Sequence, residues 1–157
     1  LCKEQKVGPA YDKTSNLGPV GSKGHQKFVL DWIEKGIEEG AQLVLDGRNV
    51  RVEGYEDGYY IGHTIFDHVT EEMDVGNREI FGPVLCIKRV KDFEEGIRLM
   101  NRNPFANGSV IFTQSGYYAR EFARRNAKVW ICPECGTENL RSAVTCSNCS
   151  EIKPTYD

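Results

Sequence analysis

Apolar residues recur along the chain with a helical period in two stretches, and a capping residue marks a third helix. Between residues 22 and 39 they fall three or four positions apart, which predicts an amphipathic helix with Ser22 as its N-cap and Gly40 as its stop. The apolar face of this helix is Phe28, Val29, Trp32, Ile33 and Ile37. Asp92 caps a second predicted helix that ends before Pro104, and Ser115 caps a third that runs to about residue 126.

Short runs rich in β-branched and aromatic residues separate these helices and predict strands. The runs are 41–45, 59–69, 84–90, 109–113 and 129–131. From residue 84 onward strands and helices alternate, which is typical of an α/β fold with parallel strands. We therefore expect a largely parallel sheet with flanking helices.

Composition and charge narrow the class of protein. Charged residues make up 27% and hydrophobic residues 39%, as in an ordinary soluble globular protein. The net charge of −3 gives the chain no bulk attraction for nucleic acid or anionic lipid. No apolar run approaches the roughly 20 residues that a membrane span needs, and no signal peptide is visible. The first residue, Leu1, indicates either a processed chain or a fragment.

Four of the six cysteines are clustered near the C-terminal end. They form two Cys-x2-Cys pairs, Cys132 with Cys135 and Cys146 with Cys149. Two turns of this kind place four thiolates in a tetrahedron around Zn²⁺ and leave no open position for a reactive water, so the site is predicted to be structural. Two disulfides or free buried thiols are the alternatives. The clustering favours a metal ion in an intracellular, reducing compartment.

The segment around these cysteines carries a longer pattern. It consists of Trp130, Cys132, Cys135, Asn139, Cys146 and Cys149. Over about residues 129 to 154 it resembles the four-cysteine zinc finger first named from a Ran-binding nucleoporin, and also a generic zinc ribbon. Members of the first family bind RNA, ubiquitin or other proteins. Most of their contact residues have no counterpart here, although Arg141 stands where an RNA-binding arginine would.

A second resemblance covers most of the rest of the chain, from about Lys6 to Arg125. Its longest motif runs from Glu79 through Phe81 to Val84 and reads Glu-Ile-Phe-Gly-Pro-Val. Shorter matches lie at 18–20, 39–41, 45–47 and 103–104. Together they resemble the aldehyde dehydrogenase superfamily, and the methylmalonate-semialdehyde dehydrogenases in particular. That resemblance implies that Glu79 binds the nicotinamide ribose hydroxyls of NAD and that Phe81 packs near the nicotinamide ring.

Other parts of that family's machinery have no counterpart in the chain. Its nucleophile lies in a Gly-Gln-x-Cys loop, whereas Cys2 lacks those neighbours and Cys86 lies in a predicted buried strand. Its general base and its Gly-rich dinucleotide-binding domain are also missing. We therefore predict no catalytic residue, interpret Glu79 and Phe81 as vestigial contacts, and do not expect NAD to bind.

These observations predict a truncated, aldehyde-dehydrogenase-like α/β half-domain over residues 1–128 and a zinc finger over residues 129–157. A cut sheet leaves an edge and apolar surface for partners to cover. The leading hypothesis is therefore a non-catalytic pseudoenzyme, held by other proteins in a larger assembly, with a mitochondrial location suggested by the family. One alternative is a fragment of an NAD-dependent semialdehyde dehydrogenase. The other is an RNA-binding zinc-finger protein that uses Arg124 or Arg141.

Overall fold

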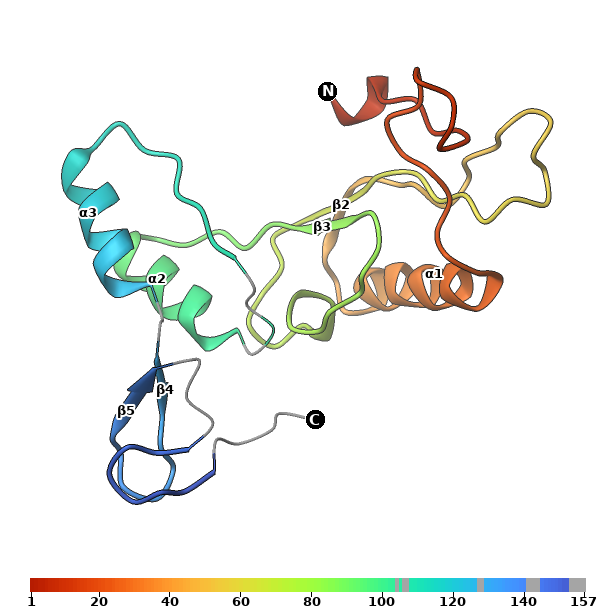
Figure 1. Cartoon of the computed structure of the whole chain (residues 1–157). Helices are drawn as coiled ribbons and strands as arrows, with labels where there is room; N and C mark the ends of the chain where they lie inside the picture. Colours follow the sequence, from red (N-terminus) through yellow and green to blue (C-terminus); the bar gives the residue numbers. More distant parts are fainter. Residues whose placement is uncertain (104, 106–107, 127–128, 141–144, 153–157) are drawn as a thin grey trace. The chain divides into compact units, whose positions relative to one another are not determined.

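The computed structural model describes residues 1–103, 105, 108–126, 129–140 and 145–152, and it forms two compact units, residues 1–89 and 90–157 (Figure 1). The helices are η1 (Cys2–Glu4), α1 (Lys23–Glu38), η2 (Asp74–Gly76), α2 (Phe93–Arg102) and α3 (Gly116–Arg125). The strands are β1 (Gln42–Leu45), β2 (Thr64–Asp67), β3 (Val84–Cys86), β4 (Val129–Ile131) and β5 (Glu138–Leu140). The predicted domain boundary between residues 128 and 129 stays a prediction.

The sheet of the first unit is small and mixed. It has the order β1-β2-β3, with β1 antiparallel to β2 and β2 parallel to β3. The prediction of a largely parallel sheet is therefore wrong for one of its two pairings. The connection from β1 to β2, residues 46–63, contains no helix that could carry the chain back across the sheet, so the strand returns in the opposite direction.

Helix α1 covers the sheet with its apolar face. The Ser22 hydroxyl accepts a hydrogen bond of 3.1 Å from the amide of His25, as predicted for the N-cap. Val29, Ile33 and Gly36 are buried. A Cβ on Gly36 would lie 2.9 Å from the ring of Phe66, so only glycine lets the helix approach the sheet this closely. The core of the unit is Val29, Ile33, Ala41, Ile61, Phe66, Val69, Val75 and Ile80.

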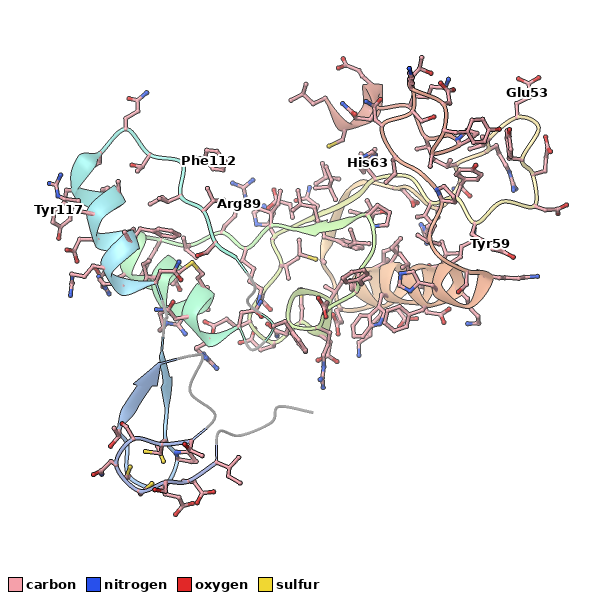
Figure 2. All side chains as sticks on the ribbon, viewed as in Figure 1. Glu53, Tyr59, His63, Arg89, Phe112 and Tyr117 are labelled. Carbon is pink, nitrogen blue, oxygen red and sulfur yellow. The ribbon has the colours of Figure 1, made fainter. Side chains whose placement is uncertain are left out.

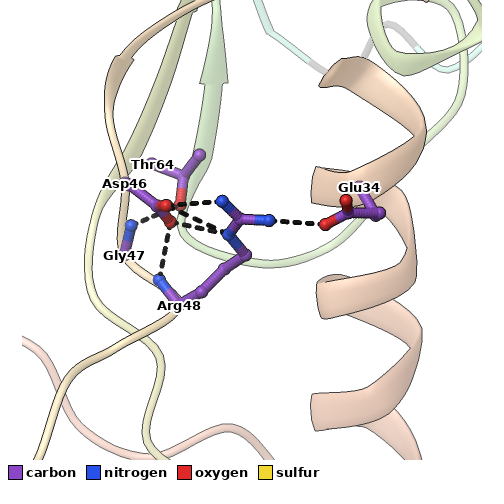
Figure 3. A network of polar contacts seen from close by, with 5 residues as sticks. All are labelled: Glu34, Asp46, Gly47, Arg48 and Thr64. Carbon is purple, nitrogen blue, oxygen red and sulfur yellow. Dashed lines mark hydrogen bonds and ion pairs between the residues drawn. The ribbon is translucent and has the colours of Figure 1, made fainter. Parts of the chain in front are cut away.

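A polar network fixes the turn after β1 against the same helix (Figure 3). The guanidinium of Arg48 binds the Asp46 carboxylate at 2.6 Å and reaches Glu34 on α1. This guanidinium lowers the pKa of Asp46. The amide of Gly47 donates to the Thr64 hydroxyl at 3.1 Å. The turn is thereby tied both to α1 and to β2.

The second unit contains two capped helices and a hairpin. Asp92 and Ser115 cap α2 and α3 as predicted. The guanidinium of Arg125 binds both carboxylate oxygens of Glu94, each at 2.6 Å, and so joins α3 to α2. Strands β4 and β5 pair antiparallel and carry the first cysteine pair between them. None of the helices in the described part of the chain is long and apolar enough to cross a membrane.

The strand predicted at 109–113 does not form. Residues 108–113 have no regular secondary structure, and Phe112 projects from the ribbon in Figure 2 with 92% of its surface exposed. A strand needs a hydrogen-bonded neighbour, and no strand among the described residues pairs with this segment. The β-branched composition of residues 109–113 was therefore not enough to form a strand.

Candidate functional site

A cavity of about 330 Å³ lies along the segment from Val75 to Cys86, between η2 and the end of β3. Glu79 and Phe81 line it and are exposed, Phe81 at 80%. Between them Ile80 is buried in the core and anchors the segment. The cavity therefore offers a carboxylate, which accepts hydrogen bonds from hydroxyl groups, and an aromatic ring, which can stack on a second ring.

The backbone of this segment is held in an unusual shape. Phe81 has a φ of 53°, in the left-handed region that residues other than glycine rarely adopt. Next to it, a Cβ on Gly82 would lie 2.7 Å from the Val29 side chain of α1, so the close approach to α1 requires glycine. Strain of this kind gathers where a fold holds a functional group in place.

The four clustered cysteines meet at one point. Their sulfur atoms all lie within 4.8 Å of one another. Cys132 Sγ is 3.5 Å from Cys149 Sγ. Cys135 Sγ is 3.6 Å from Cys146 Sγ. Four sulfurs bound tetrahedrally to zinc at about 2.3 Å stand about 3.8 Å apart, so this cluster has the size of a zinc site.

The two cysteine turns have the same geometry. The amide of Gly136 donates to the Cys132 carbonyl at 2.9 Å, and the amide of Ser150 donates to the Cys146 carbonyl at 3.0 Å. Gly136 has a φ of 69° and Ser150 a φ of 61°. Both residues are therefore left-handed, a conformation that suits glycine better than serine.

The thiols of the cluster differ in their acidity. The Thr137 hydroxyl and amide lower the pKa of Cys135 to about 6. The amide of Glu151 favours the thiolate of Cys149, but burial and the neighbouring sulfurs outweigh it and raise the pKa to about 12. A metal ion that binds all four sulfurs would have to displace the proton from Cys149, which its charge makes favourable.

The other cysteines do not join this cluster. Cys86 lies in β3, as predicted, half-buried and with its Sγ 3.4 Å from the Val75 carbonyl oxygen. Burial raises the pKa of this thiol, so it is not an activated nucleophile. Sequence reasoning missed Arg78, which lines the cavity beside Glu79 and Phe81. No pattern around Arg78 could have indicated that it lies there.

Comparison with known proteins identifies the first unit and part of the second. The sequence matches the model of the aldehyde dehydrogenase family over residues 1–137. The chain belongs to the aldehyde dehydrogenase family. This aldehyde dehydrogenase chain is 49% identical to malonate-semialdehyde dehydrogenase 1 of Oceanobacillus iheyensis over 123 residues, which cover 78% of the chain and 25% of that protein. It is 48% identical to malonate-semialdehyde dehydrogenase of Bacillus cereus strain AH187 over 120 residues, 76% and 24% of the two chains.

Solved aldehyde dehydrogenase structures share the fold. Methylmalonate-semialdehyde dehydrogenase from Oceanimonas doudoroffii superposes with a TM-score of 0.77 at 38% identity, over 83% of this chain and 26% of that one. A 1-pyrroline-5-carboxylate dehydrogenase from Thermus with bound NAD superposes with a TM-score of 0.70 at 34% identity, over 80% and 23%. The predicted likeness to methylmalonate-semialdehyde dehydrogenases is confirmed. The four-cysteine part of the prediction rests on the sulfur cluster alone.

These relatives correct two predictions. The non-catalytic pseudoenzyme in a mitochondrial assembly is wrong as the leading hypothesis, because the relatives are dehydrogenases and favour the dehydrogenase alternative. The expectation that NAD does not bind is also contradicted, since a related structure holds NAD. The chain spans about a quarter of the length of the curated relatives it matches. A missing nucleophile loop and dinucleotide-binding domain within that quarter therefore carry no information about catalysis.

Proposed function

We propose that this chain is the nicotinamide-contacting segment of an NAD-dependent malonate- or methylmalonate-semialdehyde dehydrogenase. The observation that carries the proposal is the exposed pair Glu79 and Phe81 beside a cavity of about 330 Å³, in a chain 49% identical to a malonate-semialdehyde dehydrogenase. Bound NAD would supply the hydride acceptor for oxidation of the semialdehyde. The substrate class comes from the relatives.

The residues present suit the nicotinamide half of the cofactor. The Glu79 carboxylate has two oxygens and can accept a hydrogen bond from each of two vicinal ribose hydroxyls. The Phe81 ring is exposed and can pack against the flat nicotinamide. Both are roles that the family resemblance implies. The adenine half would need groups from outside this segment.

A ligand titration of the ¹⁵N-labelled chain tests this assignment. Nicotinamide mononucleotide, which carries the ribose diol and the nicotinamide ring, should shift the amides of residues 79–82 saturably. Adenosine monophosphate, which has a ribose diol but no nicotinamide, should shift them much less. Glu79→Gln, which removes the charge at similar volume, should weaken the mononucleotide response. Equal responses to both nucleotides, or no response in the wild type, would contradict the proposal.

We also infer that Cys132, Cys135, Cys146 and Cys149 hold one Zn²⁺ ion. Sulfur separations near those of a tetrathiolate and two turns of matching backbone shape support this. Four protein ligands leave no open position, so the ion would stabilise the fold rather than react. The segment from residue 129 onward would then fold as a metal-dependent domain of its own.

Metal analysis of the chain purified without chelator tests the zinc site. One zinc per chain is expected, with almost none in Cys132→Ser. Cys86→Ser is the matched control and should retain zinc, because Cys86 lies outside the cluster. Two disulfides in place of zinc, or a metal content that Cys132→Ser does not change, would overturn the site.

A further inference from the structure

Residues 74–82, which include Glu79 and Phe81, are called the cofactor-type loop here. Helix α1 contacts the C-terminal end of this loop. The Nε2 atom of His25, in the first turn of α1, lies 2.8 Å from the carbonyl oxygen of Phe81. A carbonyl can only accept, so Nε2 carries the proton and donates. This bond holds the backbone of Phe81, whose φ of 53° sets the direction of its ring. One turn further along α1, Val29 packs against Gly82.

The same helix holds the loop at its beginning. The carboxylate of Glu39, at the C-terminal end of α1, accepts from the amides of Asp74 at 3.1 Å and Val75 at 3.0 Å. These are the first residues of η2, whose free amides a carboxylate stabilises. Lys35 completes the contact by binding the Asp74 carboxylate at 2.6 Å.

The two contacts differ from ordinary core packing. Each binds the backbone of the loop through a polar side chain at one end of α1. Glu79 lies between the two attachment points, and Phe81 carries one of them. A loop attached at both ends to one helix has fewer conformations to lose when a ligand binds. Within the loop, Ile80 is apolar and buried, and the side chain of Asn77 accepts a hydrogen bond of 2.8 Å from Lys88.

We propose that α1 fixes the cofactor-type loop in its binding conformation, with His25 and Glu39 as positioning residues. The inference rests on the proposed function, because it assigns to α1 the preparation of the surface that meets the nicotinamide ribose. His25 and Glu39 act through the backbone of Phe81 and η2 and do not themselves touch the cofactor. Their loss should therefore weaken cofactor binding without removing the groups that bind it.

The test uses the full 157-residue chain and two separate readouts. The ¹³C shifts of Phe81, which report its left-handed backbone, are measured without ligand, and the dissociation constant for nicotinamide mononucleotide is measured by titration. His25→Ala should lose the left-handed signature and bind the mononucleotide about tenfold more weakly. His25→Gln, which keeps a donor on a side chain, should restore most of both. Glu39→Gln should shift the amides of Asp74 and Val75 and weaken binding in the same direction.

Lys27→Ala is the matched control, because Lys27 is exposed on the same helix and pairs with Asp31 one turn along. It should change neither readout. Unchanged Phe81 shifts and affinity in His25→Ala would overturn the inference, as would equal losses in His25→Ala and His25→Gln. Should the wild-type chain fail to bind the mononucleotide, the proposed function falls, while the ligand-free Phe81 shifts still decide whether α1 sets the loop.

Discussion

Arg89, which follows β3, donates two hydrogen bonds to the carboxylate of Asp67 at the end of β2. The Nε atom donates to Oδ1 at 3.0 Å and Nη2 donates to Oδ2 at 2.6 Å. Asp67 is buried, with 8% of its surface exposed, whereas the Arg89 side chain is largely exposed. The pair therefore links the ends of the two parallel strands that border the cofactor-type loop.

The ion pair between Asp67 and Arg89 predicts that the fold becomes less stable in acid. Arg89, and then the amide of His68, lower the pKa of Asp67 below its ordinary value of 3.8. A lowered pKa in the folded state stabilises the fold above the ordinary value, and this contribution is lost as the pH falls below it. Asp67→Asn should therefore unfold more easily at neutral pH and lose stability less steeply below about pH 4. Denaturant unfolding between neutral pH and acid measures both effects.

Asp31→Asn is the control for that experiment, because Asp31 is an exposed carboxylate paired with Lys27 on α1. It should leave the pH profile close to that of the wild type. An Asp67→Asn profile parallel to the wild type would show that the Arg89 pair does not contribute to acid sensitivity.

Two glycines of α1 should respond oppositely to alanine. Gly36→Ala places a methyl group 2.9 Å from Phe66 and should lower the free energy of unfolding by about 1–3 kcal/mol. At Gly24 the nearest atom to a new Cβ is 3.9 Å away, so Gly24→Ala should raise it by about 0.5 kcal/mol through the lower entropy of the unfolded chain. Denaturant unfolding of both variants measures the difference. Equal effects would mean that α1 does not pack on Phe66 as described.

Replacing Ser150 by glycine should tighten zinc binding at the second cysteine turn. Ser150 has a φ of 61°, a conformation that costs a residue with a Cβ about 1 kcal/mol or more. Ser150→Gly should therefore bind zinc about fivefold more tightly in competition with a chelator. Gly136→Ala, at the matching position of the first turn, should weaken binding by a similar factor. Tighter binding by Gly136→Ala would be incompatible with the left-handed backbone there.

The segment before α3 should tolerate polar substitution. Phe112 is 92% exposed and Val110 is 69% exposed, so neither contributes to the core of the second unit. Phe112→Ser should change the free energy of unfolding by less than about 0.5 kcal/mol. It should also reduce self-association in sedimentation velocity, because it removes exposed apolar surface. A loss of stability above about 1 kcal/mol would place this ring in a packed site instead.

The helices were predictable because their signals are local. Ser22, Asp92 and Ser115 each stand next to the helix they cap, and all three helices begin where these residues indicate. Strands need partners that the local sequence does not name. The segment at 109–113 has strand composition without a described partner, and β1 pairs antiparallel although the pattern favoured parallel strands.

The site was predictable to different degrees. The spacing predicted the two cysteine turns, because each pair is closed by one short turn, and the structure brings the four sulfurs of both turns together. Glu79 and Phe81 came from the family resemblance. The bond between His25 and Phe81 joins positions 56 residues apart, and no periodicity in the sequence relates them. The error about function arose because the missing nucleophile loop and dinucleotide-binding domain were interpreted as a loss of activity. The chain spans only about a quarter of the length of its relatives.

Segment replacement in a relative tests the central claim most directly. The 123-residue matching segment of the Oceanobacillus iheyensis malonate-semialdehyde dehydrogenase is exchanged for the corresponding residues of this chain. The account predicts NAD-dependent oxidation of malonate semialdehyde with kcat/KM within about tenfold of the parent, and a raised KM for NAD when Glu79→Gln is added. A chimera that melts at the parent's temperature but shows no NAD-dependent activity would contradict it.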